Sequence, residues 1–248
     1  FYGLGLVAFQ SGLLTQASQL IEKAVSINPS NSEYQAALGN ALYSIANYPK
    51  SVIHYKKALK KDPKNSTILN NLGHAYQANL DIENAIFSYK NAISNDKNNL
   101  EYQTNLALCL QKSESFELAE KEYKRILKNN PNSVEIEHNL GALYLENNHL
   151  KHAIRCFEKC IELKPGYALA YNSLGVVETK NQNIEEAIKY YEKALEIDPT
   201  YFEASTNLAN LYGLSNHQEK TNKYYKISTI IDLYKKALSI NPNHEKTL

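Results

Sequence analysis

A four-residue pattern returns at a fixed interval along most of this chain. NNLG at 70–73 is followed by TNLA at 104–107, HNLG at 138–141, NSLG at 172–175 and TNLA at 206–209. A single closed core gives no reason for such a period, whereas an array of stacked, similar units requires one. The hydrophobic content of 43% is typical of a folded chain rather than a disordered one. The period therefore predicts a repeat protein.

Other positions keep the same period when each repeat is counted from its first residue, as from Ser32 or Ser66. The eighth place holds a small residue: Gly39, Gly73, Ala107, Gly141, Gly175 and Ala209. The twenty-fourth place holds a large side chain: Ile21, Tyr55, Tyr89, Tyr123, Phe157 and Tyr191. Proline stands near the end of most repeats: Pro29, Pro63, Pro131, Pro165 and Pro199. Small residues let helix backbones approach closely, and a large side chain fills the space beside them.

Within each repeat, apolar residues fall three or four apart over two stretches, which predicts two amphipathic helices. Proline breaks the second helix because it lacks an amide hydrogen and disfavours a helical residue before it. Ser and Asn residues after these breaks can cap the next helix. Pro49 stands where a second helix should begin, a position that proline favours. The chain is thus predicted to be a string of antiparallel helix pairs.

The order of residues within each period resembles that of the tetratricopeptide repeat (TPR) family. It runs from a small residue and Leu-Gly through Ala, Tyr or Phe and a second Ala to Pro. This resemblance covers nearly the whole chain and implies an all-α fold, an α-solenoid in which antiparallel helix pairs form a right-handed superhelix. The predicted repeats of this single array are 1–31, 32–65, 66–99, 100–133, 134–167, 168–201 and 202–244, with 245–248 starting a further repeat.

Two irregularities lead to further expectations. The seventh repeat is about nine residues too long, which matches the polar run SNHQEKTNK at 215–223, either a longer loop or extra helical turns. The chain also starts and stops inside a repeat, so we expect an interior part of a longer array. Uncapped solenoid ends of this kind would expose apolar surface, and self-association through them is one hypothesis.

The resemblance also implies a concave groove lined by the first helix of each repeat, at its second, fifth, sixth, ninth, twelfth and thirteenth places. The sixth place carries the repeated asparagine, and neighbouring places add polar side chains. The predicted peptide-binding residues are Asn71, Asn105, Asn139, Ser173, Asn207, Asn40, Asn210, Asn70, Asn172, His74, Gln77, Gln111 and His138. An asparagine amide both donates and accepts hydrogen bonds, so a column of them can hold a peptide backbone. TPR arrays of O-linked N-acetylglucosamine transferases carry a similar asparagine ladder.

Two interpretations of the asparagine column stay open. Asparagine makes up 29 of the 248 residues, so composition or a structural role can account for the recurrence. Asparagine is also a poor residue for helix interiors, which favours a role in binding. The main hypothesis is a protein–protein interaction scaffold whose groove holds an extended or helical peptide. The alternative is the substrate-recognition arm of a larger enzyme, such as a glycosyltransferase similar to O-linked N-acetylglucosamine transferase, with its catalytic domain outside this segment.

Several other classes of function are disfavoured. The net charge of +1 and the lack of a long apolar run predict binding to neither nucleic acid nor membrane, and the lysine cluster around Lys56 is expected to be a solvated helix face. Chaperone adaptors of the TPR family grip a carboxylate with basic residues at the fifth and sixth places, and this chain has none there. No phosphate-binding loop or catalytic triad is recognisable, so we expect no cofactor and no enzymatic activity in this segment.

The cysteines and histidines predict neither a disulfide framework nor a metal site. Cys109, Cys156 and Cys160 are too few for a disulfide-based fold, which favours a reducing, cytoplasmic location. His152 joins Cys156 and Cys160 at intervals of four residues on one predicted helix. The outer two would lie about 12 Å apart along the helix axis, which is too far for one zinc ion.

Overall fold

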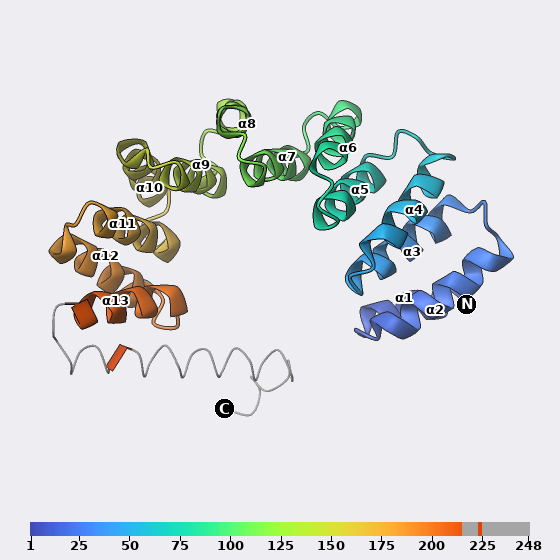
Figure 1. Ribbon diagram of the computed structural model, residues 1–248, viewed down its shortest axis with the longest axis horizontal. Helices are drawn as coiled ribbons and strands as arrows, with labels where there is room; N and C mark the ends of the chain where they lie inside the picture. Colours follow the sequence, from blue (N-terminus) through green and yellow to red (C-terminus); the bar gives the residue numbers. More distant parts are fainter. Residues whose placement is uncertain (215–222, 225–248) are drawn as a thin grey trace. The chain divides into compact units, whose positions relative to one another are not determined.

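The computed structural model describes residues 1–214 and 223–224, and this part contains thirteen helices and no strand (Figure 1). No helix in it is long and apolar enough to cross a bilayer. The predicted insertion at 215–223, apart from residue 223, lies outside the described residues. The predicted start of a further repeat at 245–248 lies outside them as well.

The helices alternate between a first and a second helix of each repeat. The first helices are α1 (Tyr2–Gln10), α3 (Ser32–Ser44), α5 (Ser66–Ala78), α7 (Leu100–Lys112), α9 (Val134–Glu146), α11 (Ala168–Lys180) and α13 (Phe202–Leu214). The second helices are α2 (Leu14–Ile27), α4 (Tyr48–Leu59), α6 (Ile82–Asn95), α8 (Phe116–Asn129), α10 (Leu150–Leu163) and α12 (Ile184–Ile197). From α3 to α13, the starts of successive first helices are evenly spaced and keep the period of the sequence. The predicted all-α solenoid of helix pairs is therefore confirmed.

Local chemistry explains where these helices begin. The side chains of Asn31, Asn65 and Asn99 accept hydrogen bonds from the backbone amides of Tyr34, Ile68 and Tyr102, at 3.0, 3.0 and 3.2 Å. Each is an N-cap that satisfies one of the amides a helix start leaves unpaired. Part of the abundance of asparagine in this chain is thus explained by capping. Proline stands in the first turn of α4, as predicted.

The turn between the two helices of a repeat relies on a left-handed residue at its fifteenth place. Only the first of these residues is a glycine, Gly12. The others are Ala46, Leu80, Glu114, Asn148 and Gln182, with φ between 58° and 64°. Non-glycine residues adopt this conformation at a cost of about 1–2 kcal/mol, so the packing of the flanking helices must hold it in place.

The chain divides into two compact units, residues 1–126 and the residues from 127 onward, with the boundary inside α8. In unit 1 each helix from α1 to α7 packs on its neighbours in sequence, and in unit 2 the helices from α9 to α13 do the same. Figure 1 shows this succession of helix pairs within each unit. Neither helix of a pair can bury its apolar face alone, so each unit gains its core by stacking.

Inside each repeat the eighth and twenty-fourth places meet. A Cβ atom built on Gly73 would lie 2.6 Å from Cε1 of Tyr89, and one built on Gly39 would lie 2.7 Å from Cδ1 of Tyr55. Both tyrosines are almost fully buried, with exposed fractions of 0% and 2%. Glycine at these two positions therefore lets the second helix place an aromatic ring directly against the backbone of the first.

Candidate functional site

Three hollows adjoin one another on the first helices of unit 1, with volumes of about 460, 250 and 340 Å³. The first two share Asn40 and Asn71, and the last two share Tyr43 and His74. Because neighbouring hollows share residues, they form one continuous surface depression, which we call the groove. Its lining includes residues from the second, fifth, sixth, ninth, twelfth and thirteenth places of the repeats.

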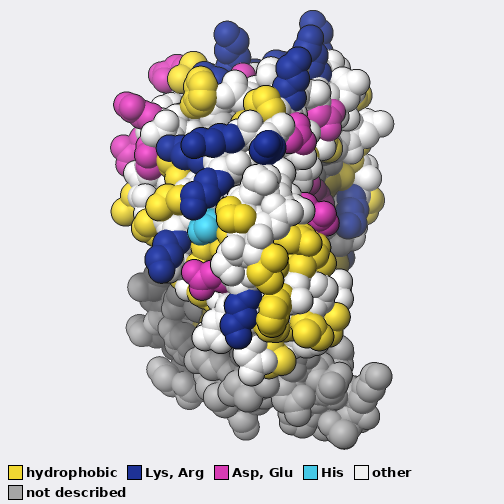
Figure 2. Space-filling model, turned by 90° about the vertical axis from the view of Figure 1, so that its right-hand side faces the viewer, with side chains coloured by type: hydrophobic (Ala, Val, Ile, Leu, Met, Phe, Trp, Pro, Cys, Tyr) yellow, Lys and Arg dark blue, Asp and Glu magenta, His cyan; other side chains and the backbone are white. Residues whose placement is uncertain are grey.

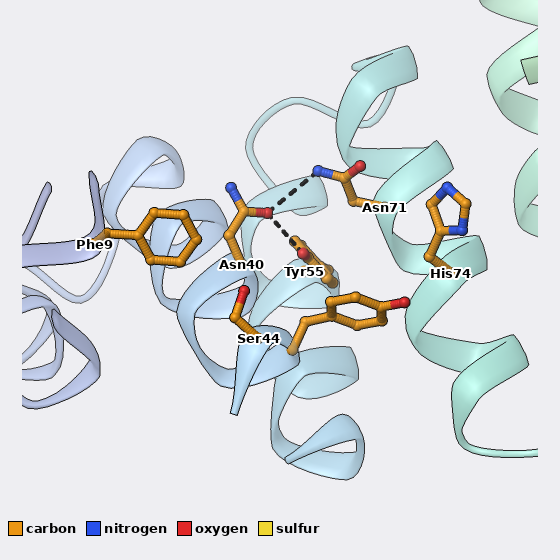
Figure 3. Close-up of a pocket in the computed structure, with 7 residues that line it drawn as sticks. Phe9, Asn40, Ser44, Tyr55, Asn71 and His74 are labelled. Atoms are coloured by element: carbon orange, nitrogen blue, oxygen red, sulfur yellow. Dashed lines mark hydrogen bonds between the residues drawn. The ribbon is translucent and has the colours of Figure 1, made fainter. Parts of the chain in front are cut away.

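Asn40 lies at the centre of the middle hollow, between Phe9 on one side and Asn71 on the other (Figure 3). Its Oδ1 accepts hydrogen bonds from the Tyr55 hydroxyl at 2.6 Å and from Nδ2 of Asn71 at 3.2 Å. These two bonds use the acceptor capacity of the Asn40 amide. They also fix its orientation, so that its Nδ2 remains available as a donor to a ligand.

The repeated asparagine of the sixth place forms bridges between neighbouring repeats. In unit 1, Nδ2 of Asn105 donates to Oδ1 of Asn70, 35 residues earlier, at 2.9 Å. In unit 2, Nδ2 of Asn207 donates to Oδ1 of Asn172, again 35 residues earlier, at 3.1 Å. Asn70 and Asn172 occupy the fifth place and are buried. The column of asparagines therefore has a structural role, because it satisfies buried acceptors across the seams between repeats.

A hydrogen-bonded chain in unit 1 determines the tautomer of His74. Nδ2 of Asn105 is 3.2 Å from Nε2 of His74, and an amide NH₂ group can only donate. Nε2 is therefore the acceptor, and the proton of the neutral ring lies on Nδ1, 3.0 Å from the Tyr89 hydroxyl. That hydroxyl in turn donates to Oε1 of Gln77 at 3.1 Å. Burial lowers the pKa of His74; the smaller effect of Glu101 raises it and that of Lys112 lowers it further, so the ring is neutral near pH 7.

Because these bonds engage both hydrogens of the Asn105 amide, Asn105 offers a ligand only its Oδ1 acceptor. Gln77 is oriented the other way, since its Oε1 accepts from Tyr89 and its Nε2 donor remains for a ligand. Hydrogen bonds within the protein thus determine whether each amide is left with a donor or an acceptor for a ligand.

Tyrosine hydroxyls at the twenty-fourth place donate hydrogen bonds to amide side chains of the first helices and orient them. Tyr123 donates to Oε1 of Gln111 at 2.9 Å, just as Tyr55 and Tyr89 donate to Asn40 and Gln77. Burial raises the pKa of Tyr55 and of Tyr89, so both keep the proton that they donate. In the fifth repeat the same place is Phe157, and the ninth and twelfth places there are Ala142 and Leu145. In repeats 2, 3 and 4, an amide side chain at the ninth or twelfth place therefore coincides with a buried ring whose hydroxyl orients it.

His138 forms the corresponding bridge in unit 2. Its Nε2 lies 2.9 Å from Oγ of Ser173, and its ring lies beside Phe157 and Tyr167. Burial lowers the pKa of His138 to about 4, so the ring is neutral near pH 7. Like Asn70 and Asn172, His138 occupies the fifth place and meets the sixth place of the next repeat.

The predicted site residues are distributed as follows. Asn40, Asn71, His74 and Gln77 line the groove of unit 1, and Asn105 and Gln111 are half-buried side chains bonded to its network. Asn70, Asn172 and Ser173 are buried. In unit 2, Asn139, His138 and Asn207 are half-buried and Asn210 is exposed.

Several residues of the groove were not predicted from the sequence. Phe9, Tyr43, Ser44 and Lys112 line it, and the hydroxyl of Tyr55 reaches into it. The sequence predicts that the large side chain of Tyr55 fills space between helices, which is correct for its buried ring, but it does not predict the hydrogen bond of its hydroxyl to Asn40. The signal that could have identified this role is the pairing of tyrosine at the twenty-fourth place with polar residues at the ninth or twelfth.

Comparison with protein-family models gives matches over most of the chain. Models described as "Tetratricopeptide repeat" match residues 1–31, 66–99, 100–133, 134–167, 168–201 and 190–223, and one described as "TPR repeat" matches residues 39–79. No curated protein sequence matches the chain significantly.

Solved structures of similar fold span the chain. The crystal structure of MamA is similar with a TM-score of 0.57 and 28% identity, covering 65% of this chain and 95% of MamA. YrrB, described as a TPR protein with an unusual peptide-binding site, has a TM-score of 0.55 and 24% identity, covering 75% of this chain and 96% of YrrB. A tetratricopeptide repeat protein from Parabacteroides merdae has a TM-score of 0.75 and 18% identity, covering 98% of this chain and 97% of its own.

Proposed function

Because this chain belongs to the tetratricopeptide repeat family, we propose that it is a protein-interaction scaffold and that the groove of unit 1 binds a partner protein through an extended peptide. The amides of the groove hydrogen-bond to the backbone of that peptide. YrrB is described as having a peptide-binding site, so a fold of this kind is compatible with such a role. The identity of the partner sequence is secondary in this mechanism, because backbone groups are common to all peptides.

The observation that carries the proposal is the arrangement of unused donors and acceptors along the groove. Asn40 and Gln77 present amide donors, because tyrosine hydroxyls occupy their acceptors. Asn71 presents an Oδ1 acceptor in the groove, because its Nδ2 bonds to Asn40. Asn105 lines none of the three hollows but is half-buried, and its Nδ2 also bonds within the protein, which leaves its Oδ1 as an acceptor. An extended peptide offers carbonyl and amide groups in alternation, and such a set of oriented donors and acceptors matches it.

A binding experiment must separate the ligand surface from the structural bridges. We would pass a random library of unstructured peptides over the protein and over an Asn71→Ala/Gln77→Ala variant. These substitutions spare the bond between Asn105 and Asn70, and Tyr89 keeps its contact with His74. Loss of two hydrogen bonds of about 1 kcal/mol each predicts about 30-fold weaker binding. The matched control is Gln16→Ala/Gln19→Ala, which removes two exposed amides from α2.

A second experiment addresses recognition through the backbone. Peptides recovered from the library would be resynthesised with N-methylated backbone amides, or with their side chains replaced one at a time by alanine. The proposal predicts that N-methylation abolishes binding while single alanine substitutions weaken it little. Equal binding by the parent and the Asn71→Ala/Gln77→Ala variant would contradict the groove assignment.

The other hypotheses drawn from the sequence remain predictions. If the chain is the substrate-recognition arm of a glycosyltransferase, it would bind its substrate in the same groove. The similarity to the TPR arrays of O-linked N-acetylglucosamine transferases rests on the sequence pattern alone. The lack of enzymatic activity in this segment and self-association through the solenoid ends are likewise predictions. Size measurement over a range of protein concentrations would test the self-association.

A further inference from the structure

The second helix of repeat 2 and the turn that follows it carry an unusual concentration of positive charge. Residues 48–64 contain six of the 27 Lys and Arg residues of the chain and one of its 26 Asp and Glu residues. The lysines are Lys50, Lys56, Lys57, Lys60, Lys61 and Lys64, and all six are exposed. We call these six residues the basic face. Figure 2, which views the molecule from the right-hand side of Figure 1, shows Lys and Arg side chains in the upper half, with Asp and Glu side chains and exposed hydrophobic side chains among them.

Some lysines on the other second helices are paired with glutamates, whereas those of the basic face are not. On α8, α10 and α12, lysines pair with glutamates one turn away, as in Lys124–Glu120, Lys159–Glu162 and Lys189–Glu186, at 2.7–2.9 Å. Among the described residues, none of the six lysines of the basic face forms an ion pair. Their charges are therefore not neutralised within the protein, and they are available to an anionic partner.

Large apolar side chains are exposed on α4 and on the second helix of the next repeat. On α4, Ile53 is 50% exposed and lies one turn before Lys56 and Lys57. Phe87 on α6 occupies the same place in the next repeat and is 65% exposed. A helix surface that combines lysines with exposed apolar side chains is the pattern of binding to the interface of an anionic membrane.

From this combination we propose that unit 1 binds the surface of an anionic lipid bilayer through the basic face, with Ile53 and Phe87 entering the interface. The basic face contains no arginine, whereas nucleic-acid interfaces depend heavily on arginine forks and on aromatic stacking. None of the six lysines lines any of the three hollows of the groove. The net charge of +1 predicted no binding to membranes, but a value for the whole chain does not report the local cluster of lysines at residues 48–64.

The proposal is tested by sedimentation with vesicles of phosphatidylcholine alone and of an equal mixture of phosphatidylcholine and phosphatidylserine. We expect binding to the mixed vesicles only, weakened by added salt. Each lysine near an anionic surface contributes about fivefold in affinity, so Lys57→Glu/Lys60→Glu/Lys61→Glu should weaken binding by about 100-fold or more. The control Lys121→Glu/Lys128→Glu/Lys151→Glu makes the same change in net charge at exposed lysines elsewhere and should bind as the parent does.

The chain has no tryptophan, so Phe87→Trp provides a single fluorescent probe. Its emission should shift to the blue on the mixed vesicles, whereas that of Phe9→Trp in the groove should not. The proposal is overturned if the parent does not bind the mixed vesicles or if both triple variants lose binding equally. It is overturned too if the emission maximum of the F87W variant does not change on the mixed vesicles. It is also overturned if oligo-dT or polyglutamate binds the basic face more tightly than the mixed vesicles at the same salt concentration.

Discussion

Replacing Asn105 by alanine tests whether the repeated asparagine is a structural bridge as well as a binding residue. The Asn105 amide donates to Oδ1 of Asn70 at 2.9 Å and to Nε2 of His74 at 3.2 Å. Asn70 is only 2% exposed, so its acceptor has little access to water that could replace the lost donor. An unpaired buried acceptor costs about 1–3 kcal/mol, and we expect Asn105→Ala to lower the free energy of unfolding by about 2 kcal/mol.

Asn71→Ala is the matched comparison, because it removes the same side chain at the same place of the preceding repeat. The bond it deletes goes to Asn40, which is exposed and can be hydrated. We expect a loss of about 0.5 kcal/mol or less. Both substitutions gain the same helix propensity, so this gain cancels in the comparison.

The assay is urea unfolding followed by far-ultraviolet circular dichroism, with amide hydrogen exchange in α5 and α7 to locate the effect. A double-mutant cycle with Asn70→Ala should give a coupling energy of about 1 kcal/mol or more, because the double variant no longer contains the Asn70 acceptor that Asn105→Ala leaves unpaired, while the loss at His74 is common to both. If Asn105→Ala and Asn71→Ala differ by less than about 0.3 kcal/mol, or if the cycle is additive within that margin, the bridge does not stabilise the fold.

Three further outcomes are expected. Gly73→Ala should lower stability by about 1–3 kcal/mol, because the new Cβ meets the Tyr89 ring; a gain of about 1 kcal/mol, as at an ordinary helix position, would contradict the packing argument. Leu80→Gly should raise the unfolding midpoint, because glycine relieves about 1–2 kcal/mol of left-handed strain at an exposed residue with φ of 62°; the same substitution at Leu118, inside α8, should lower it. For His138, the folded pKa of about 4 lies below the ordinary 6.5. The unfolded chain therefore takes up the proton first, so stability is fully present above about pH 6.5 and falls by about 3 kcal/mol as the pH approaches 4. His138→Asn should remove that part of the acid sensitivity in urea unfolding measured at several pH values, and an unchanged pH profile would show that His138 is not responsible.

Local patterns were enough to predict much of the architecture. The regular period, the spacing of apolar residues and the position of proline can all be read from the order of residues along the chain, and they located the helix pairs. The caps at Asn31, Asn65 and Asn99 follow from the same local chemistry. The left-handed residues were not predictable in this way, because Ala46 or Leu80 carries no sign of a positive φ. That conformation is imposed by the two helices that the turn connects.

The sequence by itself determined that this chain is an all-α array of helix pairs and that polar residues recur along the first helices, because both are properties of a period. Only the tertiary structure decided what each polar group can offer a ligand. Asn105 loses its donors to residues of the preceding repeat, and Asn40 loses its acceptor to Tyr55 and Asn71. Such assignments depend on partners that stacking brings within about 3 Å, the range over which a hydrogen bond forms.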